Sequence, residues 1–219
     1  MEKIARTHIY FIVFSLIFLI SGCSNSAASD IYEVLEQVAQ AEKGFENQQE
    51  PLEKLEKEEN EIYDKIIQLG MKEYDQVVKL SNEAIDLLEQ RRELMNKERE
   101  SIDKSKKEFE NIKPLISDLP EEGERKLAEE LLETMMGRYD AYEELYSNYI
   151  EGLDRNIELY HLLQKEDLAY AELTEQVEKV NHSFAKVQEA NERFNHFTKK
   201  YNELKLEFYE AAGFKIKNE

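Results

Sequence analysis

Residues that interrupt helices or cross-link chains are scarce in this sequence. Its 219 residues include one cysteine, three prolines, seven glycines and no tryptophan. A single cysteine cannot form an intramolecular disulfide, and it leaves no second sulfur for a metal site. With so few prolines and glycines, long stretches contain nothing that breaks a helix. The sequence also lacks a Gly-x-Ser-x-Gly elbow and a Gly-rich phosphate loop, which argues against the corresponding hydrolases and nucleotide-binding enzymes.

Basic residues are also few relative to acidic ones. Lys and Arg number 29 against 48 Asp and Glu, for a formal net charge of −19. Binding to nucleic acid depends on Lys and Arg that neutralise phosphates, so we expect no nucleic-acid partner. The same excess of acid argues against simple electrostatic docking on anionic lipids or wall polymers, and it favours solubility.

The first 23 residues have the order of a lipoprotein signal. Lys3 and Arg6 come first, a largely apolar run from Ile9 to Ile20 follows, and Ile20-Ser21-Gly22-Cys23 closes it. An aliphatic residue three positions before a cysteine, with small residues between, is the lipobox at which a signal peptide is cut. The apolar run is too short for a membrane-spanning helix, which needs roughly 20 residues.

Cys23 is therefore the predicted lipidation site. Residues 1–22 are the predicted signal peptide, and Ile20, Ser21 and Gly22 form its cleavage site. The two acyl chains of a diacylglycerol give stable membrane attachment, so we expect a lipid-anchored protein on the extracellular face of the cell membrane. We expect no cofactor besides this lipid. Residues 1–22 carry one acid and two bases, so their removal changes the net charge from −19 to −20.

Beyond the cysteine, the sequence predicts a short tether and one all-α domain. Residues 23–29 are the lipidated cysteine followed by Ser-Asn-Ser-Ala-Ala-Ser, a small and polar linker. Asp30 and Glu33 have the spacing of a capping box that opens a helix. No later stretch alternates apolar and polar residues as a strand does. We therefore expect residues 30–219 to form a helical-bundle domain.

Three breaks divide this domain into four helices. Pro114 and Pro120 cannot both lie inside one helix. Gly70 predicts a second break, and the polar stretch from Gln164 to Asp167 a third. Together they predict an elongated up-and-down four-helix bundle. The alternatives are a three-helix bundle, in which Pro51 to Ile112 is one helix, or a long antiparallel hairpin.

Two further patterns concern packing. Apolar residues recur in steps of three, four and seven, as in coiled-coil seams, for example at Leu88 and Met95. Pro51 is expected either to kink the first helix or to start a second one. The acidic stretch from Glu46 to Glu61 is poor in apolar residues, so we expect it to be the least well packed.

Four tyrosines form the candidate binding surface. Tyr139, Tyr142, Tyr146 and Tyr149 are spaced by three, four and three, which places them along one helical stripe. Burial in a core seam is the simpler interpretation. The functional interpretation is an exposed platform for sugar rings or a partner helix, because tyrosine combines apolar area with a polar tip.

One motif has the spacing of a metal site. Glu158-Leu-Tyr-His161 matches the Glu-x-x-His pattern of di-iron bundles, which needs a second such motif and two more glutamates. His182 and His196 have no glutamate three positions earlier. We therefore expect no metal site, and no catalytic residues, because nothing else in the sequence has the pattern of a catalytic site.

Together the lipobox Ile20–Cys23, the short tether and the highly charged helical domain resemble the YkyA-like family of cell-wall-binding lipoproteins of Gram-positive bacteria. The resemblance implies a non-enzymatic binding or scaffolding role at the cell envelope. The partners that it implies are the membrane, through the lipid, and peptidoglycan or an envelope protein. An adaptor for an envelope protein and a bundle that carries a ligand or metal remain open as alternatives.

Overall fold

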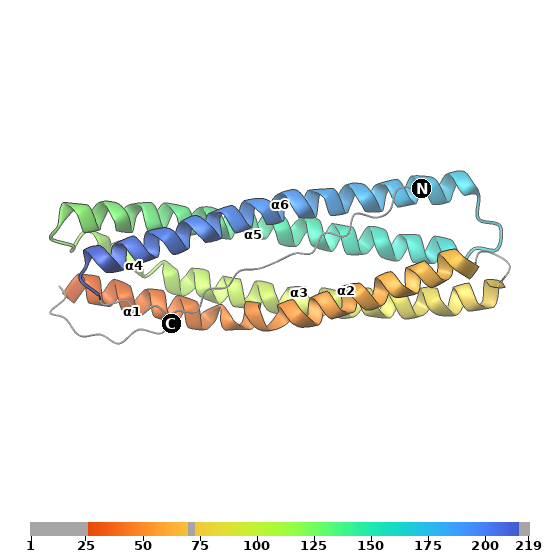
Figure 1. Ribbon diagram of the computed structural model, residues 1–219, viewed down its shortest axis with the longest axis horizontal. Helices are drawn as coiled ribbons and strands as arrows, with labels where there is room; N and C mark the ends of the chain where they lie inside the picture. The colour runs from red at the N-terminus through yellow and green to blue at the C-terminus, as the bar shows by residue number, and fades with distance from the viewer. Residues whose placement is uncertain (1–25, 70–72, 215–219) are drawn as a thin grey trace. The chain divides into compact units, whose positions relative to one another are not determined.

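A computed structural model describes residues 26–69 and 73–214 (Figure 1), and every regular element in that part of the chain is a helix. The all-α prediction is therefore confirmed. The helices are α1 (Ser26–Ala41), α2 (Lys43–Leu69), α3 (Tyr74–Phe109), α4 (Ile112–Ile116), α5 (Glu122–Leu163) and α6 (Tyr170–Ala211).

These elements form four helical stretches, as predicted. The backbone hydrogen bond from Glu42 N to Val38 O and that from Glu46 N to Glu42 O, both 3.1 Å, continue from α1 into α2. Two residues separate α3 from the short α4, and α5 and α6 stand alone. The three-helix alternative is wrong, because α2 ends at Leu69 and α3 begins at Tyr74.

The predicted breaks fall close to the observed helix ends. The stretch from Gln164 to Asp167 separates α5 from α6, and Pro120 lies just before α5, whereas Pro114 lies inside α4. Gly70 itself lies outside the described residues. Pro51 does not start a second helix, because α2 runs through it. The interruption of this stretch lies at Glu42 instead.

The predicted tether is too long. α1 begins at Ser26, and Ala27 and Ala28 are buried, with 5% and 1% of their surface exposed. Alanine is the best helix former, and its side chain is small enough to be buried beside a neighbouring helix, so Ala-Ala-Ser extends the helix. The predicted cap at Asp30 therefore lies inside α1. Residues 1–22 and Cys23 lie outside the described residues.

The described chain divides into two compact units. Unit 1 comprises Asn47–Glu98 and Glu144–Ala190, and unit 2 comprises residues 26–46, Arg99–Glu143 and residues 191–214. The division passes through α2, α3, α5 and α6, so each unit contains a part of all four helical stretches.

Within unit 1, neighbouring helices run in opposite directions. Gln49 near the start of the unit pairs with Glu98 of α3, whereas the later Glu56 pairs with the earlier Arg91. The same reversal relates α5 to α6, because Asn148 bonds to Lys186 O and Gln176 bonds to Arg155 O. Unit 1 thus has the up-and-down order.

Unit 2 ends in a helix stop that fixes the end of α6. Gly213 has φ +77°, a conformation that glycine adopts without strain. Phe214 N donates to Tyr209 O at 2.9 Å, and Gly213 N donates to Glu210 O at 3.1 Å. This is the Schellman pattern, and the Phe214 ring packs on the Tyr209 ring at 5.8 Å between centroids.

Candidate functional site

The tyrosine stripe of α5 belongs to the core. Tyr139, Tyr142 and Tyr149 are 3%, 1% and 3% exposed, and Tyr146 is half-buried. An exposed platform of four rings is therefore wrong, and the core-seam interpretation describes three of them. The spacing of three and four places these rings on the helix face that packs against neighbouring helices, where burying them gains the most.

The buried tyrosines are anchored at both their rings and their hydroxyls. In unit 2 the Tyr142 ring packs against Phe45 and Phe194, with centroids 5.8 and 5.6 Å apart. The hydroxyl of Tyr139 lies 2.6 Å from Ser105 Oγ. Burial, followed by the neighbouring Glu42 carboxylate, raises the pKa of Tyr139, so its hydroxyl stays protonated.

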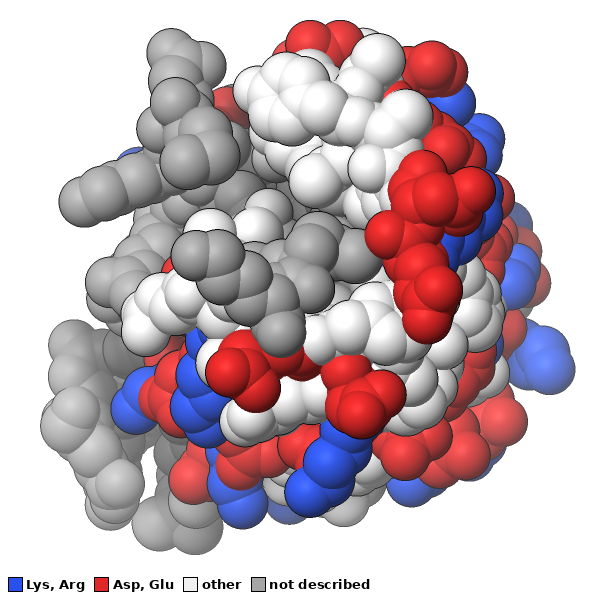
Figure 2. Space-filling view, turned by 90° about the vertical axis from the view of Figure 1, so that its right-hand side faces the viewer, with Lys and Arg blue, Asp and Glu red and all other residues white. Residues whose placement is uncertain are grey.

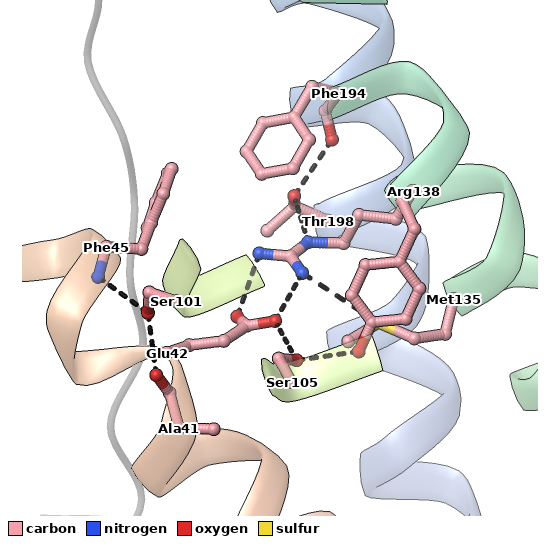
Figure 3. A network of polar contacts seen from close by, with 10 residues as sticks. Ala41, Glu42, Phe45, Ser101, Ser105, Met135, Arg138, Phe194 and Thr198 are labelled. Atoms are coloured by element: carbon pink, nitrogen blue, oxygen red, sulfur yellow. Dashed lines mark hydrogen bonds and ion pairs between the residues drawn. The ribbon is translucent and has the colours of Figure 1, made fainter. Parts of the chain in front are cut away.

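A buried arginine, Arg138, organises the polar groups around Glu42, Ser105 and Thr198 (Figure 3). Arg138 is 4% exposed, and its Nη1 and Nη2 donate to Glu42 Oε1 and Oε2 at 2.7 and 2.9 Å. Its Nε donates to Thr198 Oγ1 at 2.9 Å. Burial alone would lower the pKa of Arg138, but the Glu42 carboxylate more than offsets this and raises it. We call Glu42, Ser105, Arg138, Tyr139 and Thr198 the Arg138 cluster.

The Arg138 cluster joins all four helical stretches. Glu42 lies between α1 and α2, Ser105 on α3, Arg138 on α5 and Thr198 on α6. The guanidinium also lies over the Phe194 ring, 4.6 Å from its centroid, which adds a cation–π contact. A charge pair with these fixed partners defines one register of the four stretches in unit 2.

Next to this cluster, a serine hydroxyl is inserted into a helix. Ser101 Oγ accepts a hydrogen bond from Phe45 N at 2.9 Å and donates one to Ala41 O at 2.6 Å (Figure 3). It thus occupies the place where Phe45 N would bond directly to Ala41 O in a regular helix. Such an insertion interrupts the hydrogen-bond ladder, which explains why α1 ends and α2 begins around Glu42. Gly44 permits the approach, because a Cβ there would lie 3.0 Å from Ser101 Oγ.

Unit 1 contains a second buried arginine with its own partners. Arg91 is 3% exposed, and its Nη2 lies 2.9 Å from Glu56 Oε1 and 2.6 Å from the Tyr149 hydroxyl oxygen. The Tyr149 hydroxyl donates to Glu56 Oε1 at 2.7 Å, and burial raises its pKa well above the ordinary value. Glu59 lies nearby, with Oε2 3.8 Å from Arg91 Nη1. We call these four residues and Tyr160 the Arg91 cluster.

Glu59 is the most buried acid of this cluster. It is 6% exposed and accepts hydrogen bonds from the Tyr160 hydroxyl and from Asn156 Nδ2. Burial raises the pKa of Glu59, although Arg91 and the two hydrogen bonds act in the opposite direction. The acidic stretch that we expected to pack poorly therefore supplies a buried carboxylate.

Neither cluster was predicted from the sequence, although the seams contain a signal for the Arg91 cluster. Leu52, Glu59 and Ile66 are seven residues apart, so a glutamate occupies a seam position. Arg91 likewise lies between the seam residues Leu88 and Met95, three and four residues away. A charged residue at such a position marks a buried pair.

The Glu158 and His161 pair has the surroundings of a surface pair. Both residues are exposed, and Glu158 pairs with Arg155 at 3.1 Å and accepts from Gln176 Nε2 at 3.1 Å. Within residues 26–69 and 73–214, no group of three or more His, Cys, Asp or Glu side chains has an arrangement that could hold a metal ion.

Acidic side chains are abundant on the surface. On the face that Figure 2 shows, red carboxylates lie on the right-hand side and across the lower part, and blue Lys and Arg are interspersed among them. None of the helices in the described residues has a segment long and apolar enough to cross a membrane.

Comparisons with known proteins agree with this architecture. The "Uncharacterized lipoprotein YkyA" of Bacillus subtilis (strain 168) is 33% identical over 204 residues, which cover 93% of this chain and 92% of the relative. A crystal structure of a conserved protein of unknown function from Staphylococcus aureus is similar with a TM-score of 0.74. The match covers 83% of this chain and 91% of that one at 14% identity, so it bears on the fold alone.

The family comparison covers almost the whole described chain. The YkyA family, described as "Putative cell-wall binding lipoprotein", matches residues 26–211. That range begins at the first residue of α1 and ends at the last residue of α6. The chain therefore belongs to the YkyA family of lipoproteins, as the resemblance in its sequence predicted.

Proposed function

We propose that this protein is a non-enzymatic binding or scaffolding protein of the cell envelope, anchored by a diacylglycerol on Cys23 to the extracellular face of the membrane. The observation that carries the proposal is the position of the lipobox Ile20–Cys23, which ends three residues before α1. Membership of a lipoprotein family over residues 26–211 supports it.

A non-enzymatic role is supported by the way in which the buried polar groups are used. Arg91, Arg138 and Glu59 are each less than 7% exposed and are engaged with other side chains of their cluster. A catalytic acid or base must come within hydrogen-bond reach of its substrate. These groups instead hold neighbouring helices in register.

The negative charge limits how the protein recognises its partner. A net charge of −19 disfavours any mode in which Lys and Arg neutralise an anionic wall polymer. We therefore propose that the domain binds peptidoglycan through uncharged polar contacts, which salt does not screen. The description of the family as cell-wall binding supports the choice of this partner.

Two measurements test the proposal. First, cells that produce the wild type or the C23S variant are labelled with radioactive palmitate, and we expect label on the wild type and none on C23S. Second, the full-length protein in mild detergent is mixed with purified sacculi at low and high salt, and we expect co-sedimentation at both.

Each part of the proposal can fail separately. Palmitate labelling of C23S equal to that of the wild type, or no labelling of either protein, would refute the lipid anchor. Absence of co-sedimentation, together with recovery of one specific protein in a crosslinking pull-down from cells, would replace wall binding with an adaptor role.

A further inference from the structure

One end of unit 2 brings together the start of α1, the connection from α4 to α5 and the end of α6 (Figure 1). Tyr32, in the second turn of α1, packs against Tyr209 and Phe214, with ring centroids 5.0 and 4.9 Å apart. α1 also contacts α4. We call this end the α1 pole; it comprises residues 26–32, 112–121 and 208–214.

The start of α1 is held firmly in this pole. Ala27, Ala28 and Ile31 are 5%, 1% and 0% exposed, so unwinding the first turn would return their apolar surface to water. The Gly213 helix stop also fixes the ring on which Tyr32 packs, because it holds Phe214 against Tyr32. The first turn of α1 therefore cannot serve as additional tether.

The distance from the lipid site to the pole is consequently short. Three peptide units separate the Cα atoms of Cys23 and Ser26, which limits their separation to about 11 Å in any conformation. A tether that extended to Asp30 would have allowed about 25 Å. The headgroup layer on one side of a bilayer is about 5–8 Å thick. An acylated Cys23 thus places the start of α1 at the headgroup surface.

We propose that the α1 pole lies directly against the outer surface of the bilayer, with the connection from α4 to α5 in contact with lipid headgroups. This inference rests on the lipidation of Cys23 in the proposed function. It adds which surface of the protein faces the membrane and how close to the headgroups that surface lies.

The covalent link, and not surface charge, imposes this contact. The exposed acidic residues of the pole are Asp30, Asp118, Glu121 and Glu210, and Lys113 is the exposed base among its described residues. Such a surface does not attract anionic headgroups. The contact is therefore expected to be the same on neutral and on anionic membranes.

Fluorescence quenching from the headgroup layer tests the proposal. The full-length lipoprotein is reconstituted into phosphatidylcholine vesicles that contain a nitroxide-labelled headgroup, and a fluorophore is attached to D118C or D140C. Both positions are exposed aspartates of unit 2, and Asp140 lies on α5 about 27 Å beyond Glu122. Since Cys23 is the single natural cysteine, an acylated Cys23 leaves the added cysteine as the one free thiol.

We expect at least threefold stronger quenching at residue 118 than at residue 140. Insertion of twelve Gly and Ser residues between Ser24 and Asn25 should reduce the quenching at 118 to the level at 140, without changing flotation of the protein with the vesicles. Equal quenching at both positions of a protein that floats, or no effect of the insertion, would overturn the proposal and leave the anchor intact. Failure of the purified lipoprotein to float would overturn both.

Discussion

At the scale of single residues, the molecule depends on charged side chains placed where a bundle usually buries apolar ones. Arg138 with Glu42 and Arg91 with Glu56 and Glu59 are the two cases. Two ions taken out of water pay a desolvation cost that their attraction only partly offsets, so such pairs add little net stability. Losing one partner is costly, however, because it leaves the other buried and unpaired.

Removing the guanidinium of Arg138 should therefore destabilise the protein strongly. We expect R138M to lower the free energy of unfolding by about 3 kcal/mol, because it leaves the Glu42 carboxylate without its cation. The matched control is R99M in the same unit, where Arg99 pairs with Glu143 at 2.7 Å with both side chains more than 40% exposed. That change should cost less than about 1 kcal/mol.

Urea unfolding followed by far-UV circular dichroism measures both changes. Equal losses of unfolding free energy in R138M and R99M would show that breaking the buried pair costs no more than breaking the exposed one. Recovery of stability in the double variant E42L/R138M, relative to R138M alone, would support the argument that the unpaired carboxylate is the source of the loss.

Glu59 gives unfolding a predictable pH dependence. Its pKa is raised in the folded protein by burial, so the folded state binds a proton more tightly than the unfolded chain. The groups that face it are Glu56 and Tyr63 on α2, Arg91 on α3, and Asn156 and Tyr160 on α5. Stability from this proton is present at low pH and is lost as the pH rises through the folded-state pKa.

The comparison of wild type with E59Q isolates this effect, because all other acids are common to both. As the pH falls from 7 towards the ordinary glutamate pKa of about 4.3, wild type should gain stability relative to E59Q. Urea midpoints of both proteins across this range provide the measurement. A difference that stays constant, or that moves against the wild type on acidification, would contradict the assignment.

At the scale of helices, two glycines of α5 lie beside phenylalanine rings of α6. A Cβ at Gly137 would lie 2.7 Å from Phe197 Cε1, whereas a Cβ at Gly152 would lie 3.4 Å from Phe184 Cε1. The first contact is a clash, and the second is an ordinary van der Waals contact. The same substitution should therefore have opposite effects at the two positions.

We expect G152A to stabilise the protein by up to about 1 kcal/mol, since alanine favours the helix over glycine. G137A has the same helical gain but must displace the Phe197 ring, at a cost of about 1–3 kcal/mol. Thermal unfolding of the two variants beside wild type provides the comparison. A G137A protein as stable as G152A would show that the ring moves freely.

Much of the fold could be predicted at this scale, and the misses have physical causes. Pro114 to Pro120 and Gln164 to Asp167 fall at or next to helix ends because proline and polar interruptions act locally. The interruption at Glu42 depends on Ser101, which is 59 residues later in the sequence, and no helix starts at Pro51. Likewise, Ala27 and Ala28 are helical because they pack in unit 2, which their own composition does not reveal.

At the scale of the whole molecule, the chain combines a strongly acidic surface with two compact helical units and a lipobox. The acidic surface favours a soluble domain that does not bind anionic polymers by charge. The tyrosine stripe, our candidate binding surface from sequence, is largely core, because periodicity places residues on one face without showing whether that face is covered. The proposed attachment of the protein to the membrane therefore depends on Cys23.

Mass spectrometry of the mature protein, purified from membranes, tests that residue most directly. We predict a chain that begins at Cys23, with residues 1–22 removed and a diacylglycerol on the cysteine sulfur. A chain that retains residues 1–22, or one whose Cys23 is unmodified, would contradict the lipid anchor and every functional conclusion drawn from it.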